Sequence, residues 1–225
     1  EVLLRWQSPT GLISPAEFIP LAEELRLIVT MTQQLLERAL TDMAQWRLNG
    51  YNLYLSVNLS TQHLEQTALA SMVQQLLQRY SLPADCLRFE ITESALMRDQ
   101  QDAINTMQAL SDLGIKLALD DFGTGYSSLK YLKELPLDAI KIDRSFVQDI
   151  GIDHNDETII EAMLGMANNL GLYCVAEGVE TEQQLAFFNN RGCHLIQGFL
   201  FSRPLTAAQL ATLLTSDTFV VNRIE

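Results

Sequence analysis

The stretch "ALDDFGTGY" (residues 118–126) joins an apolar run to two acidic residues and a glycine-rich turn. Adjacent carboxylates repel each other, so Asp120 and Asp121 need a partner of opposite charge, and a divalent cation is the simplest candidate. The same order recurs along the chain: a short run rich in Leu, Ile and Val, a polar residue, then an amphipathic stretch. This recurrence decides the fold.

Short apolar runs alternate with longer amphipathic stretches throughout the sequence. The apolar runs predict strands at residues 2–6, 53–58, 87–92, 116–120, 139–142, 173–176 and 194–196. The amphipathic stretches predict helices at residues 15–25, 28–49, 62–80, 99–113, 128–134, 156–169, 181–191 and 206–214. Alternation of this kind is typical of an α/β protein with a mainly parallel sheet.

The length favours one barrel domain. An eightfold (β/α) barrel takes about 250 residues, and this chain has 225. One strand of eight is missing from the predicted set, and we expect it upstream of Glu1. The competing architecture is an open doubly wound sheet, which lacks support because no G-x-G-x-x-G turn follows a predicted strand.

Composition limits the classes of function. With 28 acidic and 15 basic residues the formal net charge is −13, which argues against a DNA-binding protein. Cys86, Cys174 and Cys193 have no metal-like spacing and are expected to be reduced thiols of a cytoplasmic domain. No apolar run is long enough to span a bilayer. Because the first residue is not methionine, we expect residues 1–225 to form a single domain of a longer protein.

Polar side chains occupy the carboxyl ends of six predicted strands. In a barrel these ends share one face, which is where active sites lie. Charged residues are rarely buried unless they are paired or bound to metal. The six positions are Asn58, Glu90, Asp120-Asp121, Lys141, Glu177 and Gln197. Each also has a structural alternative: a solvated turn, a cap, an ion pair or a backbone hydrogen bond.

The first segment adds two polar residues to this set. Glu1 and Arg5 share one face of the strand predicted at residues 2–6, because side chains alternate with a period of two. Glu1 is then directed to a metal site, and the forked guanidinium of Arg5 is suited to a phosphate.

The donor atoms indicate the kind of metal. The candidate ligands all offer oxygen, which suits Mg²⁺, Mn²⁺ or Ca²⁺ better than zinc. They are Glu1, Asn58, Glu90, Asp120 and Asp121. Asp120 is placed to bridge two ions, as in two-metal phosphodiester cleavage. Lys141 is a candidate to orient or deprotonate the attacking water, or to neutralise the transition state.

These residues resemble the EAL domain family of cyclic-di-GMP phosphodiesterases over nearly the whole chain. Eight segments occur in the family's order, which makes the resemblance specific. They are "EVLLRW" (1–6), "SPAEFIPLAEE" (14–24), "SVNLS" (56–60), "FEITES" (89–94), "LDDFGTGYSSL" (119–129), "IKIDRSF" (140–146), "AEGVET" (176–181) and "QGFLFSRP" (197–204). One departure is Val2, where the family's naming motif has alanine, and we expect it to affect packing only.

The resemblance implies a modified TIM-like (β/α) barrel whose antiparallel first strand lies upstream of Glu1. It also implies hydrolysis of cyclic-di-GMP to linear pGpG with two Mg²⁺ or Mn²⁺ ions, with Ca²⁺ inhibitory. By position, one metal would be held by Glu1, Asn58, Glu90 and Asp120, and the other by Asp120 and Asp121.

The remaining site residues follow from the same resemblance. Lys141 and Glu177 would position and activate the water, and either could be the general base. Gln197 would be a near-site polar contact, and Arg5 a phosphate contact. Glu93 would steady the loop at residues 122–128 and couple it to a homodimer interface without touching substrate.

Three functions compete. The leading one is the metal-dependent phosphodiesterase, because every ligand position and the lysine are retained. The second is a catalytically silent cyclic-di-GMP receptor, and the third is an interaction module that binds no nucleotide. Many relatives follow a sensor, a GGDEF domain or a membrane segment, so a membrane-anchored full-length protein is compatible with a cytoplasmic domain.

Overall fold

The computed structural model describes residues 1–96, 100–123 and 129–216. The chain divides into two compact units. Unit 1 comprises residues 1–90, 98–116 and 207–225, and unit 2 comprises residues 91–97 and 117–206. The chain passes between the units within strand β4 (Leu87–Thr92) and again within strand β5 (Lys116–Phe122).

Six strands form one sheet in the order β3–β4–β5–β6–β7–β8, which is also their order in the sequence. The pairs β5–β6, β6–β7 and β7–β8 are parallel. At least one helix separates each strand from the next. The predicted α/β class with a parallel sheet is therefore confirmed.

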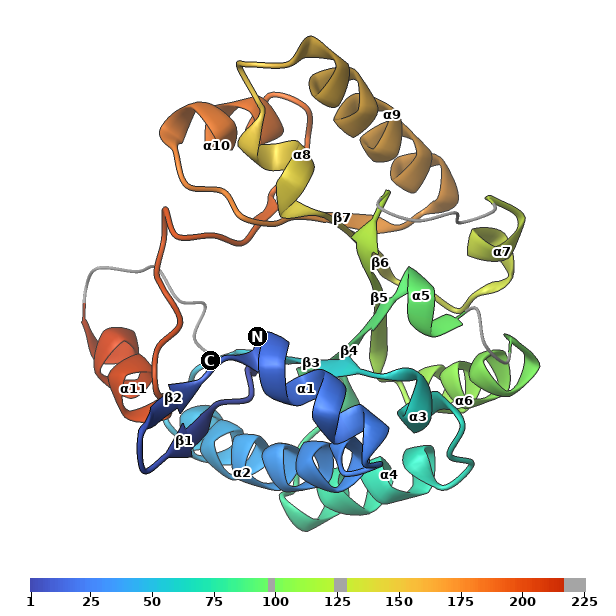
Figure 1. Cartoon of the computed structure of the whole chain (residues 1–225), viewed down its shortest axis with the longest axis vertical. Coiled ribbons are helices and arrows are strands. Elements are labelled where there is room, and N and C mark those ends of the chain that lie inside the picture. Colours follow the sequence, from blue (N-terminus) through green and yellow to red (C-terminus); the bar gives the residue numbers. More distant parts are fainter. Residues whose placement is uncertain (97–99, 124–128, 217–225) are drawn as a thin grey trace. The chain divides into compact units, whose positions relative to one another are not determined.

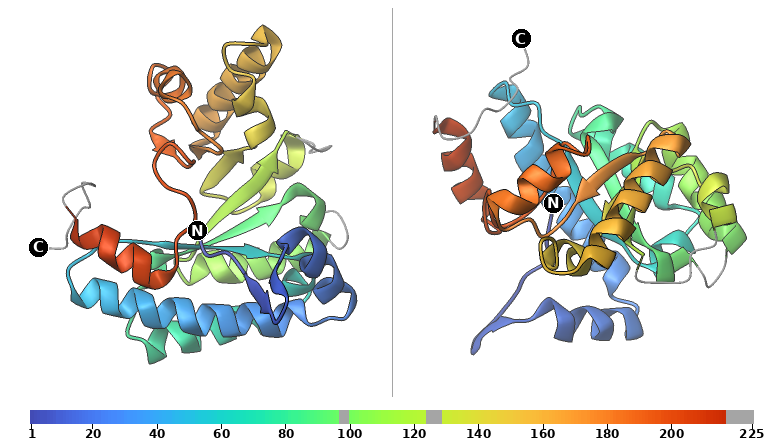
Figure 2. Two further views of the ribbon diagram at one scale, coloured as in Figure 1. Left: turned by 60° about the vertical axis from the view of Figure 1, so that its left-hand side comes forward. Right: turned by 90° about the horizontal axis from the view of Figure 1, so that it is seen from above.

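Unit 1 contains the first part of the sheet, a small hairpin and most of the long helices (Figure 1). Its elements, besides the first part of β4, are β1 (Trp6–Ser8), β2 (Gly11–Ile13), α1 (Pro15–Glu24), α2 (Ile28–Leu48), β3 (Leu55–Leu59), α3 (Thr61–Leu64), α4 (Leu69–Arg79), the 3-10 helix η1 (Ala84–Cys86), α6 (Gln100–Asp112) and α11 (Ala207–Thr215). Although α11 is distant in sequence, it lies beside α2 (Figure 2).

Helical spacing explains how α2 packs. Leu36, Leu40 and Met43 recur at intervals of four and three residues, and all three are completely buried. Positions so spaced lie on one face of a helix. This face packs on β3, where Leu55, Val57 and Leu59 are buried in turn. Unit 1 therefore has its own apolar core between α2 and the sheet.

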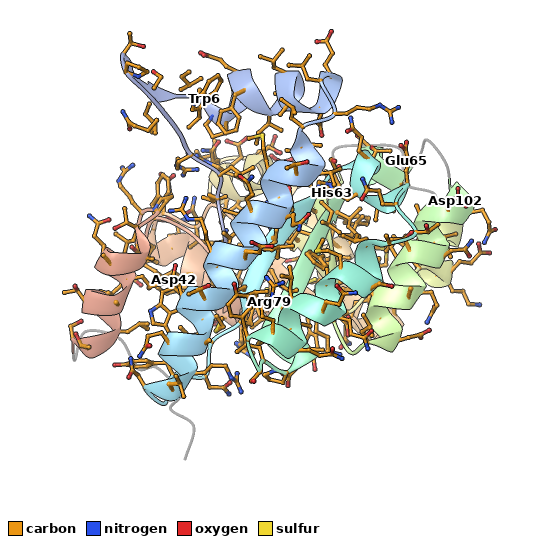
Figure 3. All side chains as sticks on the ribbon, turned by 90° about the horizontal axis from the view of Figure 1, so that it is seen from below. Trp6, Asp42, His63, Glu65, Arg79 and Asp102 are labelled. Carbon is orange, nitrogen blue, oxygen red and sulfur yellow. The ribbon has the colours of Figure 1, made fainter. Side chains whose placement is uncertain are left out.

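The strand predicted at residues 2–6 is wrong in most of its length. Only Val2 pairs with the sheet, through a parallel bridge to Val57. Trp6 instead begins β1, which pairs antiparallel with β2, and its ring meets Phe18 of α1 edge-on with centroids 5.9 Å apart (Figure 3). Aromatic packing on α1 thus stabilises the hairpin.

The single helix predicted at residues 62–80 is also wrong, because two helices occupy that stretch. Ser60 and His63 form a capping box that begins α3, and α3 ends at Leu64. A new helix, α4, starts at Leu69. Figure 3 shows His63 on α3; its side chain is buried, whereas the charged Asp102 on α6 is exposed.

Unit 2 contains the rest of the sheet and its helices. Its elements, besides parts of β4 and β5, are α5 (Glu93–Leu96), α7 (Leu129–Glu134), β6 (Ala139–Ile142), α8 (Arg144–Gln148), α9 (His154–Leu170), β7 (Tyr173–Ala176), α10 (Glu182–Asn189) and β8 (Leu195–Ile196). The short helices α5 and α8 were not predicted. The other helices begin and end within two residues of their predicted bounds, and Ser128, the first residue predicted for α7, lies outside the described residues.

Side-chain caps fix several helix starts in unit 2. Asp153 accepts a hydrogen bond from the Asn155 N–H at 2.7 Å and caps the start of α9. Gly171, in the left-handed conformation, is the C-cap of the same helix. Thr181 caps α10. In Figure 1, α9 runs alongside β6 and β7, and apolar residues of these elements form the core of unit 2.

The core of unit 2 occupies one face of β6. Ile140 and Ile142 belong to the buried cluster that includes Ile160 and Met163 of α9. Side chains alternate along a strand, so Lys141 points to the opposite face from these isoleucines. Among the described helices, none has the length and apolar character needed to cross a bilayer.

Candidate active site

In unit 1, polar residues share one face of β3 and β4. Ser56 and Asn58 are two residues apart on β3 and therefore point the same way. Glu90 on β4 is 3% exposed, and it accepts a hydrogen bond from the Ser56 hydroxyl. A buried carboxylate needs such donors because burial removes its contact with water. The Ser56 hydroxyl thus helps to hold Glu90 in place.

Glu1 lies along β3 next to Asn58. The Val2 N–H donates to the Ser56 carbonyl oxygen at 2.8 Å, which fixes the first residues to the strand. The Asn58 side-chain N–H then donates to Glu1 Oε1 at 2.8 Å. The structure therefore brings Glu1 and Asn58 together, as the predicted metal site requires.

The prediction that Arg5 shares a strand face with Glu1 is wrong. Regular pairing stops at Val2, so the period-two argument does not reach residue 5. Arg5 is exposed, and its Nη1 donates to the neighbouring Leu4 carbonyl oxygen at 2.8 Å. Its role as a phosphate contact stays a prediction.

In unit 2, a buried lysine lies between two carboxylates. Lys141 is 2% exposed, and its Nζ is 2.7 Å from Glu177 Oε1 and 3.3 Å from Asp120 Oδ1. The three residues come from β5, β6 and the position directly after β7. These strands are adjacent and parallel. The carboxyl ends of three neighbouring strands thus carry one ion-paired group, which we call the lysine cluster.

A β-bulge places the two aspartates. Between β5 and β6 the register steps from Leu119–Ile140 to Phe122–Ile142, so three residues advance on β5 while two advance on β6. The extra residue coincides with Asp121, whose φ of +53° lies in the left-handed region. Asp is one of the few residues other than glycine that adopt this conformation. The bulge breaks the ordinary alternation at the acid pair, as bulges often do beside active sites.

The surroundings of Asp120 shift the pKa of its carboxyl group in opposing directions. Burial raises the pKa of Asp120, the Lys141 ammonium opposes this rise, and the adjacent Asp121 carboxylate adds to it. The Asp121 N–H also donates to Asp120 Oδ1 at 3.0 Å. A divalent cation favours ionised carboxylates and relieves their repulsion. The donor set therefore fits a hard cation.

The predicted ligands are divided between the units: Glu1, Asn58 and Glu90 belong to unit 1, and Asp120 and Asp121 belong to unit 2. Over residues 1–96, 100–123 and 129–216, no three Asp, Glu, His or Cys side chains gather as a ready metal site. The complete ligand set stays a prediction.

The loops after β7 and β8 interlock. The Gln197 N–H donates to the Ala176 carbonyl oxygen at 2.8 Å, and the Val179 N–H donates to the Gln197 carbonyl oxygen at 3.1 Å. A Cβ on Gly198 would lie 2.0 Å from the Val179 carbonyl oxygen, so only glycine fits there. Gln197 is thereby fixed by its backbone beside the strand end that leads to Glu177.

Glu93 begins α5 and is 5% exposed. In the described part of the chain, neither of its carboxylate oxygens has a hydrogen-bond partner. An isolated buried carboxylate is costly, so this arrangement fits a residue kept for function. The loop that Glu93 is predicted to steady includes residues 124–128, which lie outside the described residues.

Sequence reasoning missed Ser56. Its hydroxyl reaches Glu90, although the two residues are far apart in sequence. The available signal was its spacing of two residues from Asn58, which puts both on one face of the strand.

Comparison with known proteins identifies the family of this chain. The sequence model of the EAL domain matches residues 1–204. The chain belongs to the EAL domain family. Solved EAL domains that superpose on the chain are TIM-like barrels, which confirms the predicted fold class.

Several relatives of this EAL domain are named for one substrate. The chain is 45% identical over 221 residues to the cyclic di-GMP phosphodiesterase NbdA of Pseudomonas aeruginosa, covering 97% of the chain and 28% of NbdA. It is 43% identical over 212 residues to the bifunctional diguanylate cyclase/cyclic di-GMP phosphodiesterase MucR of the same organism, covering 93% of the chain and 31% of MucR. The EAL domain thus spans less than a third of either relative's length.

A solved structure of the MucR phosphodiesterase, described as a cyclic-di-GMP complex, superposes with a TM-score of 0.88 at 43% identity. The alignment covers 92% of this chain and 85% of that one. The chain thus belongs to a family with members named as hydrolases of a cyclic dinucleotide.

Proposed function

We propose that this EAL domain hydrolyses cyclic-di-GMP to linear pGpG with two divalent cations. The observation that carries the proposal is the lysine cluster, in which buried Lys141 pairs with Asp120 and Glu177 at adjacent strand ends. The names of NbdA and MucR supply the substrate class. Retention of the lysine and of every predicted ligand position favours catalysis over the silent-receptor alternative, in which such residues are expected to be lost.

The proposed ligands are the five oxygen donors named above, with Mg²⁺ or Mn²⁺ bound and Ca²⁺ inhibitory. When bound, the two cations polarise the phosphodiester and lower the pKa of the attacking water. Ser56 and Asn58 orient Glu90 and Glu1 by hydrogen bonds. Such supporting contacts commonly tune metal affinity.

Two residues of the lysine cluster have separate roles in the proposed reaction. Glu177, which is paired with Lys141, is the general base and takes a proton from the attacking water. Lys141 offers an ammonium that holds Glu177 and Asp120 in place and offsets negative charge on the phosphate in the transition state. Water attacks phosphorus, the bond from phosphorus to one ribose oxygen breaks, that oxygen takes up a proton from solvent, and pGpG is released.

The wider arrangement is part of the same proposal. The domain acts as a homodimer on the cytoplasmic side, within a longer signalling protein that carries a sensor or GGDEF domain. The bifunctional name of MucR supports this partner. Glu93 transmits the state of the loop at residues 122–128, while Arg5 and Gln197 contact the nucleotide.

Chromatography of cyclic-di-GMP turnover tests the proposal. We expect pGpG in Mg²⁺ or Mn²⁺ and none in Ca²⁺ or chelator. Asp120→Asn should lower turnover at least about 100-fold, since loss of even a supporting residue of a metal site costs 10–100-fold. Asp102→Asn on the exposed face of α6 is the matched control and should keep full turnover.

Two outcomes would overturn the proposal. Tight cyclic-di-GMP binding without product in any metal would identify a receptor. Absence of both binding and product in the folded wild-type protein would leave an interaction module.

A further inference from the structure

Two arginines and a phenylalanine meet beside the lysine cluster in unit 2. Arg144 follows β6 at the start of α8, and Phe199 and Arg203 follow β8. The strands β6, β7 and β8 are adjacent and parallel. Their carboxyl ends therefore lie along one edge, the edge that also carries Glu177. We call Arg144, Phe199 and Arg203 the arginine platform.

Both arginines of the platform face the same ring. The Arg203 Cζ lies 4.5 Å from the centroid of Phe199, and the Arg144 Cζ lies 6.0 Å from it. These distances fall within the range of cation–π contacts. Phe199 is 42% exposed, so the two guanidinium groups lie over a ring that is open to solvent.

The two arginines differ in what else they bind. Arg144 donates from Nη2 to Glu180 Oε1 at 2.9 Å. Its side chain also runs across Gly178, where an added Cβ would lie 2.4 Å from Arg144 Cγ. Arg144 is therefore held by local contacts. Arg203 is exposed, and no carboxylate among the described residues lies within ion-pair distance of it.

A second arginine–phenylalanine contact in unit 2 shows what a structural pair looks like. Arg191 lies 3.6 Å from the centroid of Phe187, and Phe187 is 7% exposed. Arg191 also forms an ion pair with Glu161 at 2.7 Å. There the arginine covers a buried ring and its charge is paired. At Phe199 the ring is open to solvent, and no carboxylate of the described residues forms an ion pair with Arg203.

We propose that Arg203 recognises a guanine base of the bound nucleotide, an inference that rests on the proposed function. Guanine presents two acceptors, O6 and N7, that match the two-pronged donor of an arginine. Adenine presents N7 together with an amino donor, which opposes a guanidinium. An arginine at this edge therefore favours guanine over adenine.

The rest of the platform positions Arg203. Contact with Phe199 limits the orientations of the guanidinium, so less freedom is lost on binding. Gly198 packs on the Val179 backbone, which joins the segment after β8 to the loop that follows Glu177. Phe199 and Arg144 are thus positioning residues, and the base contact belongs to Arg203.

Base selectivity tests this assignment. Binding of cyclic-di-GMP and of cyclic-di-AMP is measured by calorimetry in Ca²⁺, where no turnover is expected. Arg203→Ala should weaken cyclic-di-GMP binding roughly tenfold and leave the weaker cyclic-di-AMP binding nearly unchanged. Arg203→Lys should behave similarly, because an ammonium lacks the fork. Arg191→Ala is the matched control and should keep the selectivity.

Steady-state kinetics gives a second measurement. Arg203→Lys should raise KM for cyclic-di-GMP more than it lowers kcat, because the base contact is present before and during the reaction. If Arg203 had only a structural role, its replacement would weaken the binding of both nucleotides equally and would lower kcat as well as changing KM. That result would overturn the assignment.

Different results would overturn the role of Arg203 and the proposed phosphodiesterase function. Unchanged affinity and selectivity in both Arg203 variants, with normal turnover in the wild type, would overturn only the role of Arg203. A wild-type protein that binds neither nucleotide would overturn the assignment together with the proposed function.

Discussion

Two basic side chains are buried in the described part of the chain, and they occupy different surroundings. Lys141 in unit 2 is 2% exposed and pairs with Asp120 and Glu177. His63 in unit 1 is 1% exposed, and its Nδ1 lies 3.0 Å from the Ser60 backbone nitrogen, which donates to it. Burial lowers the pKa of His63 to about 4, with a smaller opposing effect of Ser60.

The comparison of Lys141 with His63 shows how the surroundings of a buried basic side chain decide its charge. A buried base with no acidic partner gives up its proton, because low polarity disfavours its charge. A buried base between carboxylates forms ion pairs, which are costly to assemble and have a reason to be kept at a reaction site. Burial alone therefore does not mark a catalytic residue, and the catalytic role that we propose for Lys141 rests on its paired carboxylates at strand ends.

The largest effect is expected at Lys141. Lys141→Met keeps the apolar stem and leaves two carboxylates uncompensated, so the free energy of unfolding should fall by about 3–5 kcal/mol. Turnover of cyclic-di-GMP should fall about 100- to 1,000-fold. Urea unfolding and chromatography measure the two quantities. Lys133 on α7 is exposed, so Lys133→Met is the control and should change neither the free energy of unfolding nor turnover. Full turnover in Lys141→Met would show that the lysine cluster has no part in the mechanism.

The counterpart in unit 1 is a pH effect at His63. Its folded-state pKa of about 4 lies below the ordinary 6.5, so the unfolded chain binds more protons between these values. Stability should therefore be full above pH 6.5 and decrease as the pH falls towards 4, by up to about 3 kcal/mol. His63→Asn retains an acceptor for Ser60 and lacks the titration. Its urea midpoint should depend less on pH than that of the wild type, and parallel pH profiles would contradict this account.

A smaller effect is expected at Glu93, which is buried in unit 2 like Lys141 but has no partner for its oxygens among the described residues. Glu93→Ala should lower turnover roughly tenfold, because we propose that Glu93 acts through the loop at residues 122–128 and not on substrate. It should leave cyclic-di-GMP affinity in Ca²⁺ nearly intact. Kinetics and calorimetry on the same samples separate the two. A loss of binding as large as that of Arg5→Ala would show that Glu93 contacts substrate.

The smallest effect concerns a polar contact of unit 2 outside the lysine cluster. Thr181 Oγ1 accepts a hydrogen bond from the Gln184 N–H at 3.2 Å, and Gln184 Oε1 accepts one from the Thr181 N–H at 3.0 Å. Thr181→Ala should cost about 1 kcal/mol of stability with turnover unchanged. Thr181→Ser should restore the loss in urea unfolding. A large loss of turnover instead would mean that α10 positions Glu177.

Much of this arrangement could be predicted from the sequence because strands and their polar ends have local signals. The run that ends at Lys141 and the run before Glu177 are short, apolar and bounded, and both form strands with the predicted bounds. Parallel neighbours then bring their carboxyl ends together. The pairing of Lys141 with Glu177 follows from topology and needs no knowledge of the loops.

Other features depend on backbone detail that periodicity does not carry. The sequence pattern predicts that Trp6 ends a strand. In the structure its ring packs on Phe18, and Trp6 begins the first strand of the β1–β2 hairpin. The five-residue helix α8 is too short for a periodic pattern and depends on its cap, where Asp143 accepts from the Ser145 N–H. The contact of Arg144 with Phe199 joins residues with no relation in sequence.

The bulge at Asp121 couples strand register to chemistry. If one residue were deleted there, β5 would regain plain alternation against β6, and Phe122 would still pair with Ile142 on the core face of unit 2. The extra residue therefore supplies a second carboxylate without moving the core side chains on either side of it. A deletion tolerated in a surface loop would, at this one position, cost the protein one carboxylate of the pair and leave the core packing in place.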